Sequence, residues 1–369
     1  MFVVIIGAGI IGISIADALA QRGARVTVLD MRSPGRGASH ASAGILAPYT
    51  EAHHDSPLLP LAARSLGLYD SFVAGAAARS GRTIEYARRG TLEIAIADED
   101  TARLKGASHW LSVEGIRHEW LDLAGVRELE PAATSSASAG LLVPEHGVVG
   151  VMSLLTALTV SARLAGAGIE TSVEVEAVDV AAERDHVLVR AGNLRYTADA
   201  VVIAAGSWTS RIRVKGASAI PVRPIRGQLL HLHWPSSPLP ARVVWGPRCY
   251  VVPWHEGSVL VGATVEDVGF DERSTVAGVH DLTAAVAELL PVSWQASIEE
   301  VRVGLRPATP DGLPAMGPLP IDPRILVATG HYRNGVLLAP LTADVVSRRV
   351  LDGVSDPVLA ITNPARFTS

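Results

Sequence analysis

Three glycines near the start of the chain have the spacing of a phosphate-binding turn, and an aspartate follows at the matching distance. Gly7, Gly9 and Gly12 form the pattern G-x-G-x-x-G, and Asp30 lies about 20 residues further along. In such a motif the first glycine permits a tight turn, the second lets the backbone approach a pyrophosphate, and the third lets a helix pack closely on a strand. A carboxylate like that of Asp30 can accept hydrogen bonds from both hydroxyls of an adenosine ribose and disfavours a 2′-phosphate. These residues could therefore bind an adenine dinucleotide, with NAD and FAD both open.

The surrounding residues supply the elements that this turn needs. Residues 2–6 form a short β-branched run that predicts a strand buried on both faces, and residues 26–29 predict a second one. Between them apolar residues recur at helical spacing, and Gly23 stands where the helix would end. The helix N-terminus would present unpaired N–H groups and a partial positive charge to phosphates. The alternative is a glycine-rich turn with a surface aspartate, which the matching register of strand, helix and acid disfavours.

Composition and charge narrow the class of protein. The 369 residues are 48% hydrophobic and 19% charged, which predicts a large buried core in one domain or in two closely joined domains. The net charge of −5 gives no case for nucleic acid or an anionic membrane as partner. Cys249 is the only cysteine, which excludes an internal disulfide and a cysteine-rich metal cluster and fits a reducing compartment. We expect no metal site.

The apolar N-terminal stretch invites comparison with a membrane anchor. No positively charged region precedes residues 2–4, as a signal peptide would require. Asp17 and the three glycines interrupt the run, whereas a spanning helix needs about twenty apolar residues. The last residues, 367–369, match no targeting signal. We therefore expect a cytoplasmic protein without a membrane partner.

The rest of the chain alternates between helical and strand-like patterns. Residues 37–48 are rich in Gly, Ala and Ser, so they could line a ligand or form a flexible surface loop. The patterns predict helices at residues 58–79, 98–115 and 153–168, a loop at 130–147, and strands at 91–97, 170–175, 187–189 and 200–204. Strands of a more antiparallel sheet are predicted at 221–232, 248–253, 259–262 and 299–303, and a strand, glycine turn and helix start at 325–340.

These patterns predict an α/β fold with a discontinuous nucleotide-binding domain and an inserted substrate domain. The Rossmann-like nucleotide domain would comprise residues 1–85, 145–215 and 306–369. The substrate domain would comprise residues 86–144 and 216–305 and would be α+β with a largely antiparallel sheet.

Eight segments, in this order, resemble the D-amino-acid-oxidase-like flavoproteins, and among them the glycine oxidases of thiamine biosynthesis. The resemblance covers nearly the whole chain, and an ordered set is far more specific than one glycine motif. The segments are GAGIIGISIADALAQRGARVTVLD, GASHASAGILAP, VVIAAGSWT, PVRPIRGQLL, YVVPW, VGATVEDVGFDER, GLRPATPDGLPAMG and GHYRNGVLLAP.

The resemblance implies FAD as a non-covalently bound cofactor. His40 raises the question of a covalent flavin link, but the related amine dehydrogenases carry their histidine at the place of Ala41. The resemblance assigns the ADP half of FAD to Gly7, Gly9, Ile10, Ile11, Gly12 and Asp30, and the flavin and pyrophosphate to Ser39, Ala43 and Gly44 in the small-residue loop. It places the adenine at the backbone of Val173, and Gly206 and Trp208 beneath the cofactor. The residues expected along the isoalloxazine are Gly330, His331, Arg333, Asn334, Gly335 and Val336.

The resemblance also implies the residues that bind the substrate. Arg306 in GLRP would bind a carboxylate, for which a bidentate arginine suits the planar geometry. Tyr250 in CYVVPW would add a hydroxyl donor. A lone arginine is more often structural and a lone tyrosine more often core, and only the segment matches favour a site. For Arg333, substrate binding and a scaffold role stay equally open.

The implied reaction is oxidation of a small amino acid or amine. Hydride would pass from the α-carbon to flavin N5, and the imine would hydrolyse to a 2-oxo acid and ammonia. Dioxygen would reoxidise the flavin and yield hydrogen peroxide, and no dedicated side-chain base is expected. Ile45 and Val265 replace methionines of the family near the expected pocket, so the pocket could differ in shape and admit larger amines. Glycine is therefore the first expected substrate, followed by sarcosine and small D-amino acids. Two alternatives remain: a dehydrogenase that reduces a quinone, and a nucleotide-binding protein without catalytic activity. The composition also permits a homo-oligomer.

Overall fold

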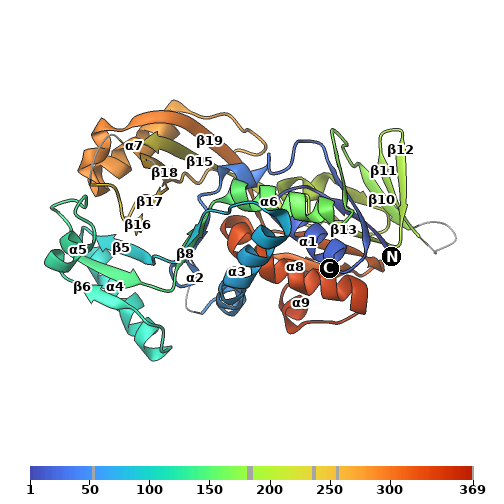
Figure 1. The fold of residues 1–369 in the computed structure, drawn as a ribbon, viewed down its shortest axis with the longest axis horizontal. Helices are drawn as coiled ribbons and strands as arrows, with labels where there is room; N and C mark the ends of the chain where they lie inside the picture. Colours follow the sequence, from blue (N-terminus) through green and yellow to red (C-terminus); the bar gives the residue numbers. More distant parts are fainter. Residues whose placement is uncertain (52–54, 181–185, 235–237, 255–256, 368–369) are drawn as a thin grey trace.

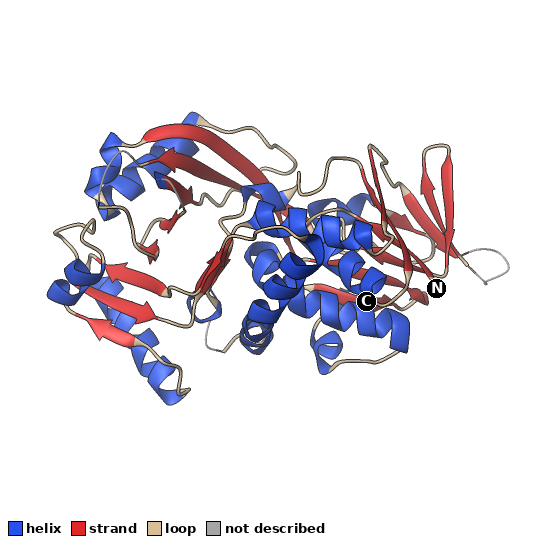
Figure 2. Ribbon diagram, viewed as in Figure 1, coloured by secondary structure: helices blue, strands red, loops and turns tan. Residues whose placement is uncertain are grey.

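The computed structural model describes residues 1–51, 55–180, 186–234, 238–254 and 257–367. The described residues form four β-sheets. A six-stranded sheet and its helices occupy the right-hand part of Figures 1 and 2, and an eight-stranded sheet occupies the left-hand part. Among the described residues no helix is both long and apolar enough to span a membrane.

The six-stranded sheet carries the glycine motif. Its order is β20-β21-β13-β1-β2-β9, parallel except for the antiparallel pair of β20 and β21. In β1, Val3 and Ile5 belong to one core cluster and Val4 and Ile6 to another, which explains the continuous apolar run. The bounds are β1 Phe2–Ile6, β2 Arg25–Asp30, β9 Gly168–Thr171, β13 Ala200–Ile203, β20 Ala315–Leu319 and β21 Asp322–Thr329.

Helices cover one face of this sheet, and a smaller sheet covers the other. Helix α1 packs on α6 and α8, and α3 packs on the same two helices. The four-stranded sheet has the order β12-β11-β10-β14 and shares a core cluster with β1 and β13. The bounds are α1 Ile10–Gln21, α3 Leu58–Ser80, α6 Val151–Leu164 and α8 Gly335–Asp352, with β10 Ala177–Val180, β11 Val187–Ala191, β12 Leu194–Ala198 and β14 Arg213–Val214.

The eight-stranded sheet has the order β19-β15-β18-β17-β16-β5-β7-β6. All of its pairs are antiparallel except β16 with β5. The bounds are β5 Thr91–Ala95, β6 Glu119–Leu121, β7 Ala139–Val143, β15 Arg223–His233, β16 Val243–Trp245, β17 Tyr250–Pro253, β18 Ser258–Gly262 and β19 Ser297–Ala308.

Short elements complete the fold. A three-stranded sheet has the order β3-β8-β4. The remaining elements are β3 Ile45–Leu46, β4 Tyr86–Ala87 and β8 Gly147–Val149; helices α2 Pro48–Glu51, α4 Asp98–Val113, α5 Leu123–Leu129, α7 Val276–Leu289 and α9 Pro357–Ile361; and 3-10 helices η1 Ala38–Ala41, η2 Gly206–Arg211, η4 Pro291–Gln295, η5 Tyr332–Asn334 and η6 Pro364–Phe367.

The prediction of a loop over residues 130–147 was wrong. Strand β7 lies within it, buried along its whole length between β5 and β6. Its sequence AGLLV holds only one β-branched residue, Val143, so the pairing with β5 decides the conformation. The strand expected at 170–175 lies earlier, at β9. The expected boundary between residues 305 and 306 falls inside β19, and the division into domains stays a prediction.

Candidate active site

One cavity of about 520 Å³ receives residues from both large sheets. On the six-stranded sheet it lies at the carboxyl ends of the parallel strands, where Ile6 lies between Ala204 and Asp30. Strand β1 has β2 on one side and β13 on the other, and such a reversal of strand order is where open α/β sheets bind ligands. On the eight-stranded sheet the lining includes Tyr250 and Arg306.

Most of the predicted cofactor residues line this cavity. Gly12, Gly330 and Asn334 are outside its lining. Those that line it are Gly7, Gly9, Ile10, Ile11, Asp30, Ser39, Ala43, Gly44, Val173, Gly206, Trp208, His331, Arg333, Gly335 and Val336.

The glycine turn is enforced by the close packing of three backbone segments. Gly7 has a φ of +111°, and a Cβ there would lie less than 3.0 Å from the carbonyl oxygen of Ala204. A Cβ at Gly12 would lie even closer to the carbonyl oxygen of Gly7. Only glycine therefore fits at either position, because both obstacles are backbone atoms. The result is that α1 begins directly over the carboxyl end of β1.

Asp30 ends β2 and faces the cavity from a partly buried position. Its Oδ2 accepts a hydrogen bond from the backbone N–H of Ala8 at 2.6 Å, and its Oδ1 accepts one from that of Arg32 at 2.7 Å. Burial raises the pKa of the Asp30 carboxyl, against the lowering effect of these two bonds and of the Arg32 charge. The carboxylate is thus fixed to the glycine turn.

Arg32 is a cavity residue that the sequence reasoning missed. Its guanidinium forms a bidentate pair with Glu272, at 2.9 and 2.6 Å, and lies over the Trp208 ring at 4.6 Å. Trp208 in turn contacts Phe270. Residues after β18 thereby cover this end of the cavity. No local pattern links Arg32 to a segment so distant in the chain.

Two residues of the last predicted segment differ strongly in exposure. His331 is fully buried, with Nε2 3.1 Å from Thr342 Oγ1, and burial lowers the pKa of its imidazole to about 3. Arg333 lines the cavity from an exposed position, beside the Tyr332 ring. The first turn of α8, at Gly335 and Val336, also lines the cavity and directs the positive end of that helix dipole toward it.

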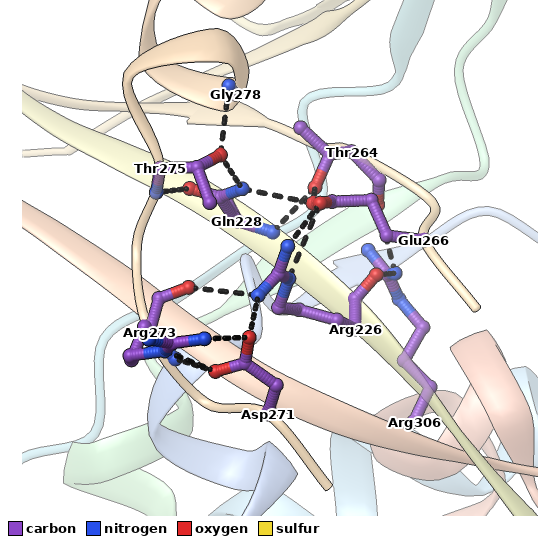
Figure 3. Close-up of polar contacts among 9 residues, drawn as sticks. All are labelled: Arg226, Gln228, Thr264, Glu266, Asp271, Arg273, Thr275, Gly278 and Arg306. Carbon is purple, nitrogen blue, oxygen red and sulfur yellow. Dashed lines mark hydrogen bonds and ion pairs between the residues drawn. The ribbon is translucent and has the colours of Figure 1, made fainter. Parts of the chain in front are cut away.

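Arg306 and Tyr250 reach the cavity from β19 and β17. Nη1 of Arg306 donates to the backbone carbonyls of Thr264, at 2.9 Å, and Arg226, at 3.3 Å (Figure 3). Tyr250 lies opposite Gly262 in the neighbouring strand and packs on Trp245, with ring centroids 5.2 Å apart. A Cβ at Gly262 would lie less than 3.0 Å from the Tyr250 hydroxyl, so the glycine makes room for that side chain.

A polar group at another part of the lining was also missed. Glu93 on β5 is buried, accepts a hydrogen bond from Thr50 Oγ1 at 2.9 Å and pairs with Arg103 at 3.0 Å. All three line the cavity, together with Arg248. They come from separate elements, and no spacing in the sequence unites them.

Four positions singled out in the sequence differ in their relation to the cavity. Ile45 lines it, whereas Val265 is 52% exposed and does not. Val265 directly follows Thr264, whose carbonyl binds Arg306, so it lies near the pocket without contributing to its lining. Ala41 lines the cavity and His40 does not, since Nδ1 of His40 lies 2.7 Å from the Gly37 carbonyl.

The residues present fit an adenine dinucleotide. The cavity joins a glycine turn that no Cβ could enter, the start of a helix and a carboxylate held for a ribose. Among the described residues no group of three or more His, Cys, Asp or Glu side chains could hold a metal ion.

Comparison with known proteins distinguishes between the dinucleotides. A family model described as FAD dependent oxidoreductase matches residues 3–349. The chain belongs to this family. A glycine oxidase from Geobacillus kaustophilus is 35% identical over 94% of this chain and 93% of its own length. The bifunctional protein ThiO/ThiG of a Nostoc species is 34% identical over 97% of this chain, which spans 54% of that protein.

A solved structure shows the same fold for this member of the FAD dependent oxidoreductases. The crystal structure of glycine oxidase from Geobacillus kaustophilus superposes with a TM-score of 0.93 at 32% identity, covering 99% of this chain and 98% of that one. The expected fold class and the expected cofactor, FAD, are both confirmed.

Proposed function

We propose that this chain is an FAD-dependent oxidase of small amino acids, with glycine as its leading substrate. The observation that carries the proposal is that Arg306 and Tyr250 line the same cavity as the glycine turn. The similarity to glycine oxidases along 94% of the chain supports it. When bound, FAD supplies a two-electron acceptor for hydride.

Arg306 would bind the substrate carboxylate, and Tyr250 would donate its hydroxyl to the same group. Nη1 of Arg306 donates to two carbonyls, which fixes the plane of the guanidinium and orients it for bidentate binding. Binding the carboxylate orients the α-carbon, and alignment of this kind contributes much of the rate acceleration in such reactions. Arg333 lines the same cavity from an exposed position, so it can assist at the entrance.

His331 is the only histidine among the described cavity residues, and the buried carboxylate of Glu93 is already paired with Arg103. The buried His331 has a pKa lowered to about 3, which makes it a poor proton acceptor at neutral pH. We infer that the amine reacts in its neutral form, after losing its proton to solvent. The overall reaction converts glycine, dioxygen and water into glyoxylate, ammonia and hydrogen peroxide.

The test is anaerobic reduction of the FAD-loaded protein by a panel of glycine, sarcosine, D-alanine and D-proline. Bleaching of the flavin absorbance, fastest with glycine, is the expected result. No bleaching by any of the four would contradict the proposal and favour a nucleotide-binding protein without redox activity. Turnover with an artificial acceptor but negligible peroxide in air would instead indicate a dehydrogenase.

The similarity to a bifunctional protein ThiO/ThiG supports a place in thiamine thiazole biosynthesis. A strain that lacks the gene should then require thiamine for growth, and the wild-type gene should restore growth without it. Growth of the deletion strain without thiamine would contradict this role. A cytoplasmic location and a homo-oligomeric state stay predictions.

A further inference from the structure

The substrate-site arginine is held by two carbonyl groups from separate parts of the chain. Nη1 of Arg306 donates to the carbonyl of Thr264, in the segment after β18, and to that of Arg226, on β15 (Figure 3). A Cβ at Gly227 would lie less than 3.0 Å from the Arg306 guanidinium, so the arginine packs directly on β15. The position of the guanidinium therefore depends on how β15 and the segment after β18 are joined.

The side chains of the same two residues meet on one carboxylate, that of Glu266. The Thr264 hydroxyl donates to Oε1 of Glu266 at 2.6 Å, and the Arg226 guanidinium donates to Oε2 at 2.5 and 3.2 Å. The backbones of Glu266 and Arg226 are also paired, by hydrogen bonds of 3.0 and 2.8 Å. Glu266 thus joins the two carbonyls that hold Arg306.

Further bonds fix this joint to the rest of the eight-stranded sheet. Gln228 donates to Oε1 of Glu266 at 2.8 Å, and its amide also exchanges two hydrogen bonds with Thr275, the N-cap of α7. Arg226 pairs with Asp271 at 3.1 Å and donates to the Arg273 carbonyl at 3.1 Å. Figure 3 shows these side chains converging on Arg226 and Glu266.

The charges within this group depend on one another. The Arg226 side chain is 5% exposed and that of Glu266 is 25% exposed. Burial raises the pKa of Glu266, but the hydrogen bonds from Arg226, Thr264 and Gln228 outweigh it and hold the pKa below its usual value. Loss of the Glu266 carboxylate would leave the buried Arg226 guanidinium with Asp271 as its remaining charged partner in this group.

We propose that Glu266 is a positioning residue for substrate binding: it fixes Arg306 through the Thr264 and Arg226 carbonyls and thereby sets the affinity for the substrate carboxylate. The proposal rests on the proposed function, in which Arg306 binds that carboxylate. Glu266 is outside the cavity lining, so it acts through Arg306 and not by contact with substrate.

The test compares Glu266→Ala and Glu266→Gln with the matched control Asp267→Ala. Asp267 is the next carboxylate in the chain and forms an ion pair with Arg223, with both side chains more than half exposed. The probe is glycolate, which has the carboxylate of glycine but a hydroxyl in place of the amine. Its dissociation constant is measured from the perturbation of flavin absorbance in the FAD-loaded protein, beside kcat, KM for glycine, flavin content and thermal stability.

Glu266→Ala should raise the glycolate dissociation constant and KM about tenfold while kcat and flavin content change less than about twofold. Glu266→Gln should show a smaller effect, because its amide oxygen can still accept from Thr264 and Gln228. Asp267→Ala should match the wild type. Should Glu266→Ala fail to fold, Thr264→Val, which removes the hydroxyl and keeps the carbonyl, must show the same split between KM and kcat.

Two outcomes would overturn the inference. One is an unchanged glycolate dissociation constant in a folded, FAD-loaded Glu266 variant, and the other is an equal effect of Asp267→Ala. Failure of the proposed function looks different, because the wild-type protein itself would then neither bind glycolate nor be reduced by glycine.

Discussion

The backbone N–H of Ile10 donates a hydrogen bond of 3.0 Å to Ser39 Oγ, which joins the first turn of α1 to the small-residue loop. Both residues line the cavity. The bond gives a polar partner to one of the N–H groups that a helix start leaves unpaired. It also holds the loop beside the place where the helix would receive the pyrophosphate of FAD.

Ser39→Ala should weaken FAD binding by about two- to tenfold, the range expected for one hydrogen bond. Titration of apoprotein with FAD, followed by quenching of flavin fluorescence, measures the dissociation constant. Ser71→Ala is the control, since that hydroxyl bonds the Leu68 carbonyl on the exposed side of α3. Equal affinity of the Ser39 variant and the control would refute a role for the Ser39 hydroxyl.

Gly12→Ala should abolish FAD binding and lower stability, because its Cβ would overlap the backbone carbonyl of Gly7. Neither backbone segment can move without displacing α1 from β1. The ratio of flavin to protein absorbance and the Tm measure the two effects. Gly67→Ala is the matched control: this glycine lies within α3 with no atom within 4 Å of its Cβ, so alanine there should be neutral or stabilising. A yellow Gly12→Ala protein of normal Tm would contradict the packing argument.

Arg306→Ala should keep the bound flavin but raise KM for glycine by about 10²-fold or more, because the carboxylate loses its charged partner. Arg306→Lys should recover only part of this loss, since an ammonium lacks the planar, bidentate geometry. Steady-state kinetics with peroxide detection provide the comparison. Wild-type KM in either variant would exclude Arg306 as the carboxylate partner.

Acid should destabilise the folded protein through His146. This histidine is buried, receives the Tyr49 N–H on Nε2 and bonds Thr91 Oγ1 through Nδ1. Burial lowers its pKa to about 3, so below pH 6.5 the unfolded chain takes up a proton that the folded one does not. The free energy of unfolding should therefore fall by about 1.4 kcal/mol per pH unit for this residue between pH 6.5 and 3.

Urea denaturation of His146→Asn between pH 7.5 and 5 checks this expectation. The variant should start less stable, because the native bonds are lost, but its stability should fall less steeply as the pH drops. His109→Asn, at an exposed position on α4, should keep the wild-type slope. Parallel slopes for wild type and His146→Asn would show that His146 does not account for the acid sensitivity.

Local patterns were enough to predict the elements that carry the glycine turn. The apolar run of β1, the spacing of Gly7 to Gly12 and the position of Asp30 are all set by neighbours within one βαβ unit. In contrast, β7 was missed because its residues become a strand only by pairing with β5. Arg32 and Glu93 were missed because their partners lie in remote segments.

The sequence by itself determined the glycine turn and, through the resemblance of eight ordered segments, the cofactor; it also predicts Asp30 as the carboxylate for the ribose. Only the tertiary structure decided that Glu266 ties together the two carbonyls that hold Arg306, and that Val265 is half exposed outside the cavity lining. The physical reason is the range of the interactions. A helix dipole and a tight turn act within a few residues, whereas the joint at Glu266 exists only after β15, β18 and β19 have paired in register.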